Sequence, residues 1–537
     1  MDFQDTDAIF KRYERMKSKR GTWESLWEEI SERVLPRSSE FTGTRTPGDK
    51  RTDKMYDATS ALALERFAAA VESLLTPRGA RWHTLRTSDP ELSRVPEVAA
   101  WFDAVENALF HYRYAPRANF ASQMHEGYLS LGAFGTGGMF VDEKFDEGFR
   151  YRAVHLSDMF IAENEHGIID TVYRKMDCTA RQVALMFNDE DISKEVRDKA
   201  NDNPDERVEL LHVVAPRTDR DVSMRDRINM EFGSAYYETK TKTVIEEGGY
   251  EDFPYIISRY VTGPRETYGR SPAMLVLPDI KMLQAMSRVV IRAGEKVVDP
   301  PLLIADDGVI LPVNTRAGGA TFARLDGRTQ APIQPLNTGG RPDIGEDMME
   351  RRRRTINDAF LVTLFQILVD SPAMTATEVL QRAQEKGALL APTVGRQQSE
   401  TLGPLIEREL GILARQGLLP EVPEILQGQE YQVEYVSPLS RAMKSEEGVG
   451  ILRTLEMVQP IAAVDPSVMD NFNFDEITRV LADVNGVPQS ILNDQEQIQQ
   501  VRQGRAQQQQ LQQAVQAAPQ AADAALKISQ ISQAAQQ

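Results

Sequence analysis

Two long helical patterns that enclose a segment rich in glycine and proline constrain the fold of this chain most. Ser271-Pro272 is a helix N-cap followed by proline at the first helical position, and an apolar repeat then continues to about Val298, with a bend expected at Pro278. Residues 300–342 contain many Gly and Pro residues, and the short runs between them show an alternating pattern. This combination is typical of a β-rich insert. A DIGE capping pattern at 343–346 then predicts a returning helix to about Leu368.

Before this arrangement, periodicity predicts an α+β unit over residues 1–265. Helices are expected over 7–35, 58–75, 97–113 and 119–132, and strands within 132–164 and over 167–177, 208–215, 234–246 and 254–261. Asp57 is expected to cap the second of these helices. A capping box at Thr179 predicts a further short helix after the strand at 167–177.

After the returning helix, a dense apolar run at 360–369 meets a short break at 370–374. A capping box at Thr375 predicts a new helix that continues to about Gly417, with interruptions at Gly387, Pro392 and Gly403-Pro404. Residues 440–492 are again expected to be helical. The final segment is rich in Gln, and two interpretations stay open for it: a disordered tail, or a marginal helix that packs against its own copies.

The charge and the cysteine content exclude several classes of protein. The net charge is −18, from 80 acidic and 62 basic residues, whereas a free nucleic-acid binder normally carries a basic excess. The chain could still surround DNA without holding it. One cysteine permits no disulfide within the chain, and the six histidines never pair at metal-ligand spacing. The N-terminus lacks the apolar core of a signal peptide, and no apolar run is long enough for a bilayer, so no membrane anchor is expected.

Motifs for catalysis and cofactor binding are missing from the sequence. There is no phosphate-binding loop, and the glycines at 132–138 precede a predicted strand rather than a helix. Acidic groups at 163–166 and 188–191 lack a third partner at fixed spacing for a metal. We therefore expect no catalytic residue, no cofactor and no metal site, and an enzyme is the weaker class.

Two basic groups are candidate contact residues. Lys281, Arg288 and Arg292 lie on the helix face opposite its apolar side, where they would contact DNA weakly or pair with acids of a neighbouring copy. The run Arg351, Arg352, Arg353 and Arg354 is either ordinary surface charge beside nearby acids, or a contact with a neighbouring copy, a partner or a DNA backbone.

Several sequence segments, taken in their order and spacing, resemble the portal proteins, or head-to-tail connectors, of short-tailed bacteriophages. They run through nearly the whole chain: YDATSALALERFAAAVESLLTPRGARWHTL (56–85), GAFGTGGMFVDE (132–143), HGIIDTVYRKMDCTARQV (166–183), YGRSPAMLVLPDIKMLQ (268–284), MTATEV (374–379) and GVPQSIL (486–492). The helix, insert and returning helix stand where this family has its stem and clip.

The resemblance implies a mainly α fold with small β parts, which forms a ring with wing, stem, clip and crown around a central channel. The implied division is a wing over 1–265, stem helices over 266–299 and 343–368, a clip over 300–342, a tunnel loop over 369–374, a long wing helix and return over 375–439, a crown over 440–493, and a Gln-rich C-terminal segment over 494–537. The tunnel loop would comprise Val369, Asp370, Ser371, Pro372, Ala373 and Met374.

The resemblance also implies a function and partners. The chain would form a homo-oligomeric ring, usually of twelve copies, at one capsid vertex of a virion that is assembled in the host cytoplasm. Double-stranded viral DNA would pass through it non-specifically during packaging and ejection. Its partners would be the terminase large subunit, tail adaptor proteins, and the major capsid and scaffolding proteins. Two alternatives remain: another ring component of the virion, such as an adaptor or tail tube, and a metal-dependent DNA-processing enzyme.

Overall fold

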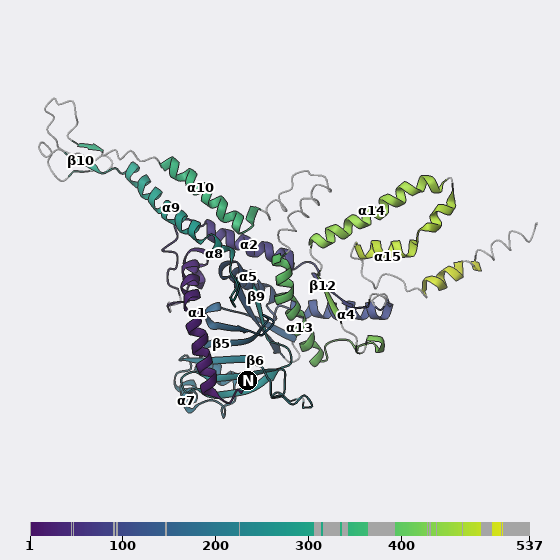
Figure 1. The fold of residues 1–537 in the computed structure, drawn as a ribbon, viewed down its shortest axis with the longest axis horizontal. Coiled ribbons are helices and arrows are strands. Elements are labelled where there is room, and N and C mark those ends of the chain that lie inside the picture. The colour runs from purple at the N-terminus through teal and green to yellow at the C-terminus, as the bar shows by residue number, and fades with distance from the viewer. Residues whose placement is uncertain are drawn as a thin grey trace, which may run out of the picture. The chain divides into compact units, whose positions relative to one another are not determined.

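The computed structural model contains two compact units, one formed by Met1–Trp82 with Ala108–Leu419 and the other by His83–Asn107 with Pro420–Gln537 (Figure 1). The structure describes residues 2–43, 46, 48–89, 92, 95–144, 148–224, 226–304, 313–314, 333–335, 342–363, 392–426, 428, 431–435, 438–463, 465–484, 497–505 and 507–508. Helices and antiparallel sheets both occur in it, so the expectation of an α+β fold is confirmed. None of the described helices is both long and apolar enough to cross a bilayer.

The first unit contains a five-stranded antiparallel sheet that is covered on both faces. Its strand order is β4-β5-β6-β7-β8, and the bounds are β4 Met159–Glu163, β5 Ile169–Thr179, β6 Arg207–Pro216, β7 Phe232–Glu238 and β8 Thr243–Tyr250. Helix α1 (Thr6–Val34) packs on one face through Phe10 and Tyr13, against the odd-numbered positions Leu211 and Val213 of β6. Because side chains alternate along a strand, the even-numbered positions face the other side.

The other face of this sheet is covered by two short helices, α6 (Ala180–Met186) and α7 (Lys194–Asp202). Val183 and Val196 of these helices join Val208 and Leu210 in a separate apolar cluster. Thr179 forms the expected capping box, in which its hydroxyl accepts from the Gln182 amide and the Gln182 side chain accepts from the Thr179 amide. The expected single strand at 234–246 is two strands, β7 and β8, joined by a turn in which Lys242 has a φ of 55°.

A second sheet connects the five-stranded sheet to helices α2 (Thr59–Leu75) and α5 (Phe120–Phe134). Its order is β3-β2-β9, with β2 Thr136–Lys144, β3 Gly148–Val154 and β9 Tyr255–Arg259. Helix α5 precedes β2 and packs against α2. Gly132 permits this close approach, because a Cβ at that position would lie 2.6 Å from the Leu64 side chain. The glycines at 132–138 therefore serve packing and a turn.

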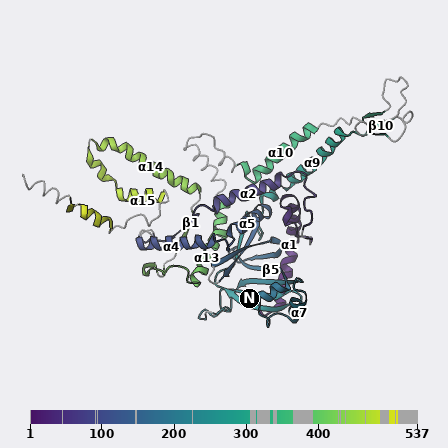
Figure 2. The same cartoon turned by 180° about the vertical axis from the view of Figure 1, so that it is seen from behind.

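The two helical patterns around the insert form a pair. The first is interrupted at Val276 into α8 (Pro272–Leu275) and α9 (Leu277–Val298), so the bend falls just before Pro278. Ser271 caps α8 by accepting from the Met274 amide. The returning helix α10 covers Pro342–Ala359 and lies beside α9 (Figures 1 and 2). Between them, β10 (Leu302–Ile304) pairs antiparallel with β11 (Ile333–Pro335), as expected of a β-containing insert.

Helix α10 is shorter than the expected helix to Leu368. It ends at Ala359, Phe360 is buried against Phe67 of α2, and Leu361 has a φ of 58°. A left-handed conformation is costly for a branched residue and cannot continue a helix. The apolar run at 360–369 continues the helical pattern in the sequence. In the structure, however, Phe360 is buried against α2 and the chain turns at Leu361.

A long helix lies after the segment 364–391. It runs from residue 392 to Arg415 and contains a π-helical stretch, Gln398–Leu402, directly before α13 (Gly403–Arg415). Pro404 explains the π stretch, because its ring has no N–H to donate and would clash with the carbonyl four residues earlier in a regular helix. The interruption expected at Gly403-Pro404 is thus confirmed, and Gly417 ends the helix with a φ of 66°.

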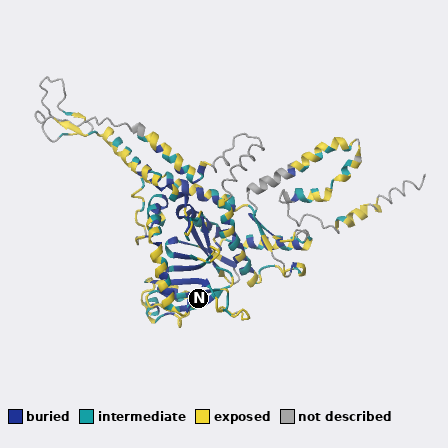
Figure 3. Ribbon diagram, in the orientation of Figure 1, coloured by how far each residue is buried: buried dark blue, intermediate teal, exposed yellow. Residues whose placement is uncertain are grey.

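The second unit joins distant parts of the sequence. Strand β1 (His83–Thr87) pairs antiparallel with β12 (Tyr431–Tyr435), and helix α4 (Pro96–Arg113) begins in this unit. Helices α14 (Pro438–Ala462) and α15 (Phe474–Val484) follow. Residues 83–107 therefore associate with the C-terminal part of the chain rather than with the rest of 1–265. Burial in the first unit is concentrated on the sheets, α2 and α5 (Figure 3).

Candidate functional site

The pair formed by α9 and α10 is the most distinctive structural feature of the described chain. Gly345 of α10 lies so close to α9 that a Cβ on it would be 2.7 Å from the Val290 side chain. The Ser287 hydroxyl lies 3.3 Å from the Met349 sulfur, which is a second contact between the helices. All buried residues of α9 fall between Leu277 and Ser287. The first half of α9 is therefore packed into the unit, while the second half is open to solvent.

A polar network fixes the base of this helix pair. The Gln284 side chain, 6% exposed, accepts from the amides of Tyr56 and Asp57 and donates to the Asp57 carbonyl at 2.7 Å. The Asp57 carboxylate accepts from the Thr59 amide at the start of α2 and from Arg353 of α10 at 2.8 Å. Although burial alone would raise it, these hydrogen bonds hold the pKa of Asp57 below its ordinary value. One loop thereby connects α2, α9 and α10.

Sequence patterns revealed only half of this network. Asp57 was expected to cap α2, but the N-cap is Ala58, which makes no side-chain cap bond; Asp57 lies one residue earlier and accepts from the Thr59 amide. Its pairing with Arg353, and the contribution of Gln284, had no signal in the sequence because the partners lie more than two hundred residues apart.

The four consecutive arginines of α10 do not act as one patch. Arg352 pairs with Asp279 of α9 at 2.7 Å, and Arg353 pairs with Asp57. Arg354 lies 3.4 Å from Glu350 one turn earlier, and Arg351 is exposed. The sequence analysis predicted either surface charge or a contact with another molecule for this run. It did not predict that Arg352 and Arg353 would connect α10 to other segments of the same chain.

The basic residues expected on α9 are divided in a similar way. Lys281 pairs with Glu29 of α1 at 2.6 Å. Arg288 is exposed, with its guanidinium 5.8 Å from the centre of the Tyr56 ring, and Arg292 is exposed further along. Lys281 thus has a partner within the chain, while Arg288 and Arg292 form no ion pair with the described residues.

Helix α9 also has an apolar side that the sequence interpretation missed. Met282 is 45% exposed and Val289 is 64% exposed, although both are large apolar residues. They are seven residues apart and therefore lie on one side of the helix, away from the buried Ile280 and Leu283. The sequence predicted one apolar face and one basic face for this helix, but the structure shows a further apolar side. No residue of the described chain covers this side.

The expected tunnel loop, Val369 to Met374, lies outside the described residues. The described segments that flank it end at Thr363 and resume at Pro392, and both contribute residues to one small cavity beside α2. Leu361, Thr393 and Val394 line a small apolar cavity together with Phe67 and Val71 of that helix.

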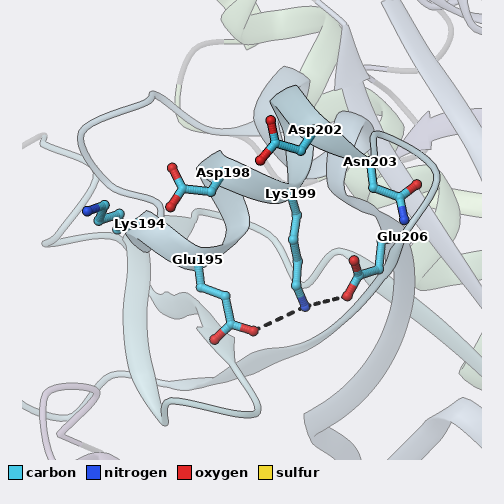
Figure 4. A pocket seen from close by; sticks show the side chains of 7 residues that line it. All are labelled: Lys194, Glu195, Asp198, Lys199, Asp202, Asn203 and Glu206. Carbon is cyan, nitrogen blue, oxygen red and sulfur yellow. Dashed lines mark ion pairs between the residues drawn. The ribbon is translucent and has the colours of Figure 1, made fainter.

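The described residues do not form a site for metal chemistry. No group of three or more His, Cys, Asp or Glu side chains is arranged there to hold an ion. Glu163 of the first acidic group pairs with Arg259, and Asn188 and Asp191 of the second bond to one another at 3.1 Å. An open hollow of about 530 Å³ lies along α7, where Lys199 bridges Glu195 and Glu206 at 3.1 and 2.7 Å (Figure 4). It is polar and shallow rather than an enclosed apolar pocket.

The described chain is thus an α+β body with a long helix pair around a small β insert. Residues 6–492 match the family described as bacteriophage head to tail connecting protein, and the chain belongs to that family. It is 28% identical to the portal protein of Salmonella phage epsilon15 over 509 residues, which cover 92% of this chain and 90% of that protein. It is 30% identical to the probable portal protein of Bordetella phage BPP-1 over 502 residues, covering 91% and 89%. The expected resemblance to portal proteins is confirmed.

Proposed function

We propose that the chain assembles into a ring of twelve copies at one capsid vertex and forms the channel through which viral DNA is packaged and ejected. In this proposal α9 and α10 are the stem, 300–342 is the clip, and 369–374 is the tunnel loop that narrows the channel. The wing comprises 1–265 with the long helix of 375–439, and the crown comprises 440–493. The terminase large subunit docks first, and the tail adaptor replaces it. The capsid and scaffolding proteins hold the ring at the vertex.

The observation that carries this proposal is the uncovered apolar side of α9. Met282 and Val289 would expose apolar area to water in an isolated copy, which is unfavourable. A neighbouring copy placed side by side can cover this area with its own helix pair, and repetition of one such contact closes a ring. The rigid base formed by Asp57, Gln284 and Arg353 would hold each pair at one angle.

The charge of the chain agrees with a DNA conduit. A net charge of −18 per copy disfavours tight binding to phosphate, and a duplex that must move cannot be trapped. Arg288 and Arg292 are the described candidates on α9 for weak backbone contacts, because both are exposed whereas Lys281 is paired with Glu29.

Electron microscopy of the purified chain tests this proposal. We expect rings of one symmetry with a central hole, and expect Met282→Ser combined with Val289→Ser to abolish rings while leaving a folded monomer by circular dichroism. A matched control is Met224→Ser with Val222→Ser, which changes two exposed apolar residues on a loop of the sheet layer. A wild-type monomer at all concentrations would refute the ring, and metal-dependent cleavage of DNA by the pure protein would instead favour a processing enzyme.

A further inference from the structure

The first half of α1 carries a row of basic side chains that faces solvent. Lys11, Arg15 and Lys19 are all exposed and are spaced four residues apart. At 100° per residue they lie along one side of the helix, roughly opposite the buried Phe10 and Tyr13, over a length of about 12 Å. We call these three residues the basic stripe. It stands out in a chain whose net charge is −18.

The basic stripe has no acidic partner among the described residues. The salt bridges of α1 use other side chains, namely Arg20 with Glu24, Arg33 with Glu29 and Glu32, Glu29 with Lys281, and Glu32 with Lys54. Residues 11–20 contain one acid, Glu14, which is also exposed. Surface bases in this chain are commonly paired within the chain, so an unpaired row points to a partner outside it.

The opposite face of the same sheet carries the opposite charge. The segment from Asn188 to Glu206, which contains α7, has eight acidic and three basic residues. Lys199 pairs with Glu195 and Glu206, and Lys240 pairs with Glu195 as well, so two cations balance these two carboxylates and the remaining charge belongs to others (Figure 4). Apart from Asp191, which accepts a hydrogen bond from Asn188, the exposed acids with no ion pair in the described chain are Asp189, Glu190, Asp198, Asp202 and Asp205.

This acidic face also has an exposed apolar centre. Leu185 is 77% exposed and Met186 is 45% exposed at the end of α6, directly before the acidic residues. An apolar centre with a charged rim is the usual composition of a protein–protein contact. We call Leu185, Met186 and the five unpaired acids the acidic face.

The two surfaces lie on opposite sides of one layer. α1 covers the face of the sheet formed by Leu211 and Val213, and α6 with α7 covers the face formed by Val208 and Leu210. The basic stripe and the acidic face therefore point in opposite directions from the same sheet. Two different, complementary surfaces on opposite sides of a subunit are what a head-to-tail contact between identical copies requires, and such contacts generate a ring when the rotation from copy to copy closes.

We propose that the basic stripe of one copy binds the acidic face of the next, and that this contact holds the sheet layers of adjacent copies together. The inference rests on the proposed ring and specifies which surfaces join the copies. Because both surfaces are exposed, their attraction is screened by salt, so assembly weakens as ionic strength rises above the physiological range.

A charge-swap experiment tests the contact. Lys11→Glu with Arg15→Glu, and separately Asp198→Lys with Asp202→Lys, should each raise the concentration for half-assembly by about tenfold or more, because like charges then face each other. The combination of all four substitutions should restore assembly. Sedimentation velocity measures the fraction in rings, and circular dichroism checks that each variant is folded.

The control variant carries the same charge change elsewhere. Lys17 is exposed but lies on the side of α1 away from the basic stripe, and Lys50 lies in an exposed loop, so the combination of Lys17→Glu and Lys50→Glu should assemble like the wild type. If the two charge-reversed variants also assemble like the wild type, the contact is refuted while the ring stands. The contact is also refuted if the variant with all four substitutions does not regain assembly. It is refuted as well if the variant with Lys11→Glu and Arg15→Glu loses only its binding to duplex DNA. A wild-type chain that forms no ring refutes both proposals.

Discussion

Arg113 and Glu409 form an ion pair that is fully inaccessible to water. Both side chains are 0% exposed, and the Arg113 Nε lies 3.1 Å from each carboxylate oxygen of Glu409. Tyr151 donates its hydroxyl to the same carboxylate, and the guanidinium lies 4.5 Å from the Trp82 ring centre. Burial raises the pKa of the Tyr151 hydroxyl well above its ordinary value, so this phenol stays a donor. The pair attaches α13 to the body of the first unit.

We expect Glu409→Gln to lower the free energy of unfolding by about 3–5 kcal/mol, because Arg113 would remain buried without a counter-charge. Denaturant unfolding of the purified protein measures this change. Glu407→Gln, two residues away on the same helix at an exposed position, is the matched control and should change stability little. Equal effects of the two substitutions would contradict the assigned importance of the buried pair.

His212 makes stability depend on pH. Its ring is buried, shares hydrogen bonds with the hydroxyls of Tyr255 at 2.6 Å and Ser234 at 2.9 Å, and stacks on Tyr236. Burial, and then the positive charge of Arg174, hold the pKa of His212 well below its ordinary value. The folded state therefore keeps this ring neutral, whereas the unfolded chain takes up a proton near pH 6.5.

The stabilisation from neutral His212 is complete above pH 6.5 and is lost as pH falls below it. Between pH 7.5 and 5.5 the wild type should lose about 1.4 kcal/mol more than His212→Gln, which cannot titrate. Unfolding midpoints in urea at both pH values measure the difference. An identical pH dependence of the two proteins would show that His212 does not carry this effect.

At the scale of elements, the angle of the helix pair depends on a few polar contacts at its base. Arg353 of α10 and Asp57 before α2 are 34% and 7% exposed, so solvent screens their attraction only partly. Gln284 of α9 binds the same loop independently of charge.

We expect a double-mutant cycle of Asp57→Asn and Arg353→Gln to show a coupling energy of about 1 kcal/mol. The two side chains are part-buried and form two specific hydrogen bonds, so we expect a larger coupling energy than for an ordinary surface pair. Thermal unfolding of the two single variants and the double variant gives the coupling. The same cycle on Arg354 and Glu350, an exposed pair within α10, should give a smaller value.

At the scale of the whole molecule, the proposed channel depends on a segment between two helices that are attached to the same body. Leu361 on one side and Thr393 with Val394 on the other line the same cavity as residues of α2. Helix 392–415 is held further along by Arg259 with Glu400, and by Arg415 with Asp252 at 2.8 Å. Because of these attachments, the proposed tunnel loop could change its conformation without displacing the subunits of the ring.

Replacement of Ser371, Pro372 and Ala373 by glycine should therefore impair packaging or retention of DNA while rings still form. The change removes the restriction that Pro372 places on the backbone. Packaged DNA per particle and ring formation by electron microscopy measure the two effects separately. Loss of ring assembly with no separate DNA defect would contradict the assignment of 369–374 as the tunnel loop.

Much of the local structure followed from the sequence. The helices α1, α2, α4 and α5 and the capping at Thr179 and Ser271 were expected, because apolar spacing and side-chain caps act over a few residues. The family could also be predicted, because the matching segments keep their order along nearly the whole chain.

Contacts between distant residues were decided only by the tertiary structure. The pairing of β1 with β12, the joining of Asp57 to Arg353, and the turn at Leu361 depend on segments that the fold brings together. The same is true of the opposite charge on the two faces of one sheet. A local pattern can specify which side of a helix is apolar, but which neighbour covers that side is determined by packing of the whole chain, and for α9 by other copies in our proposal.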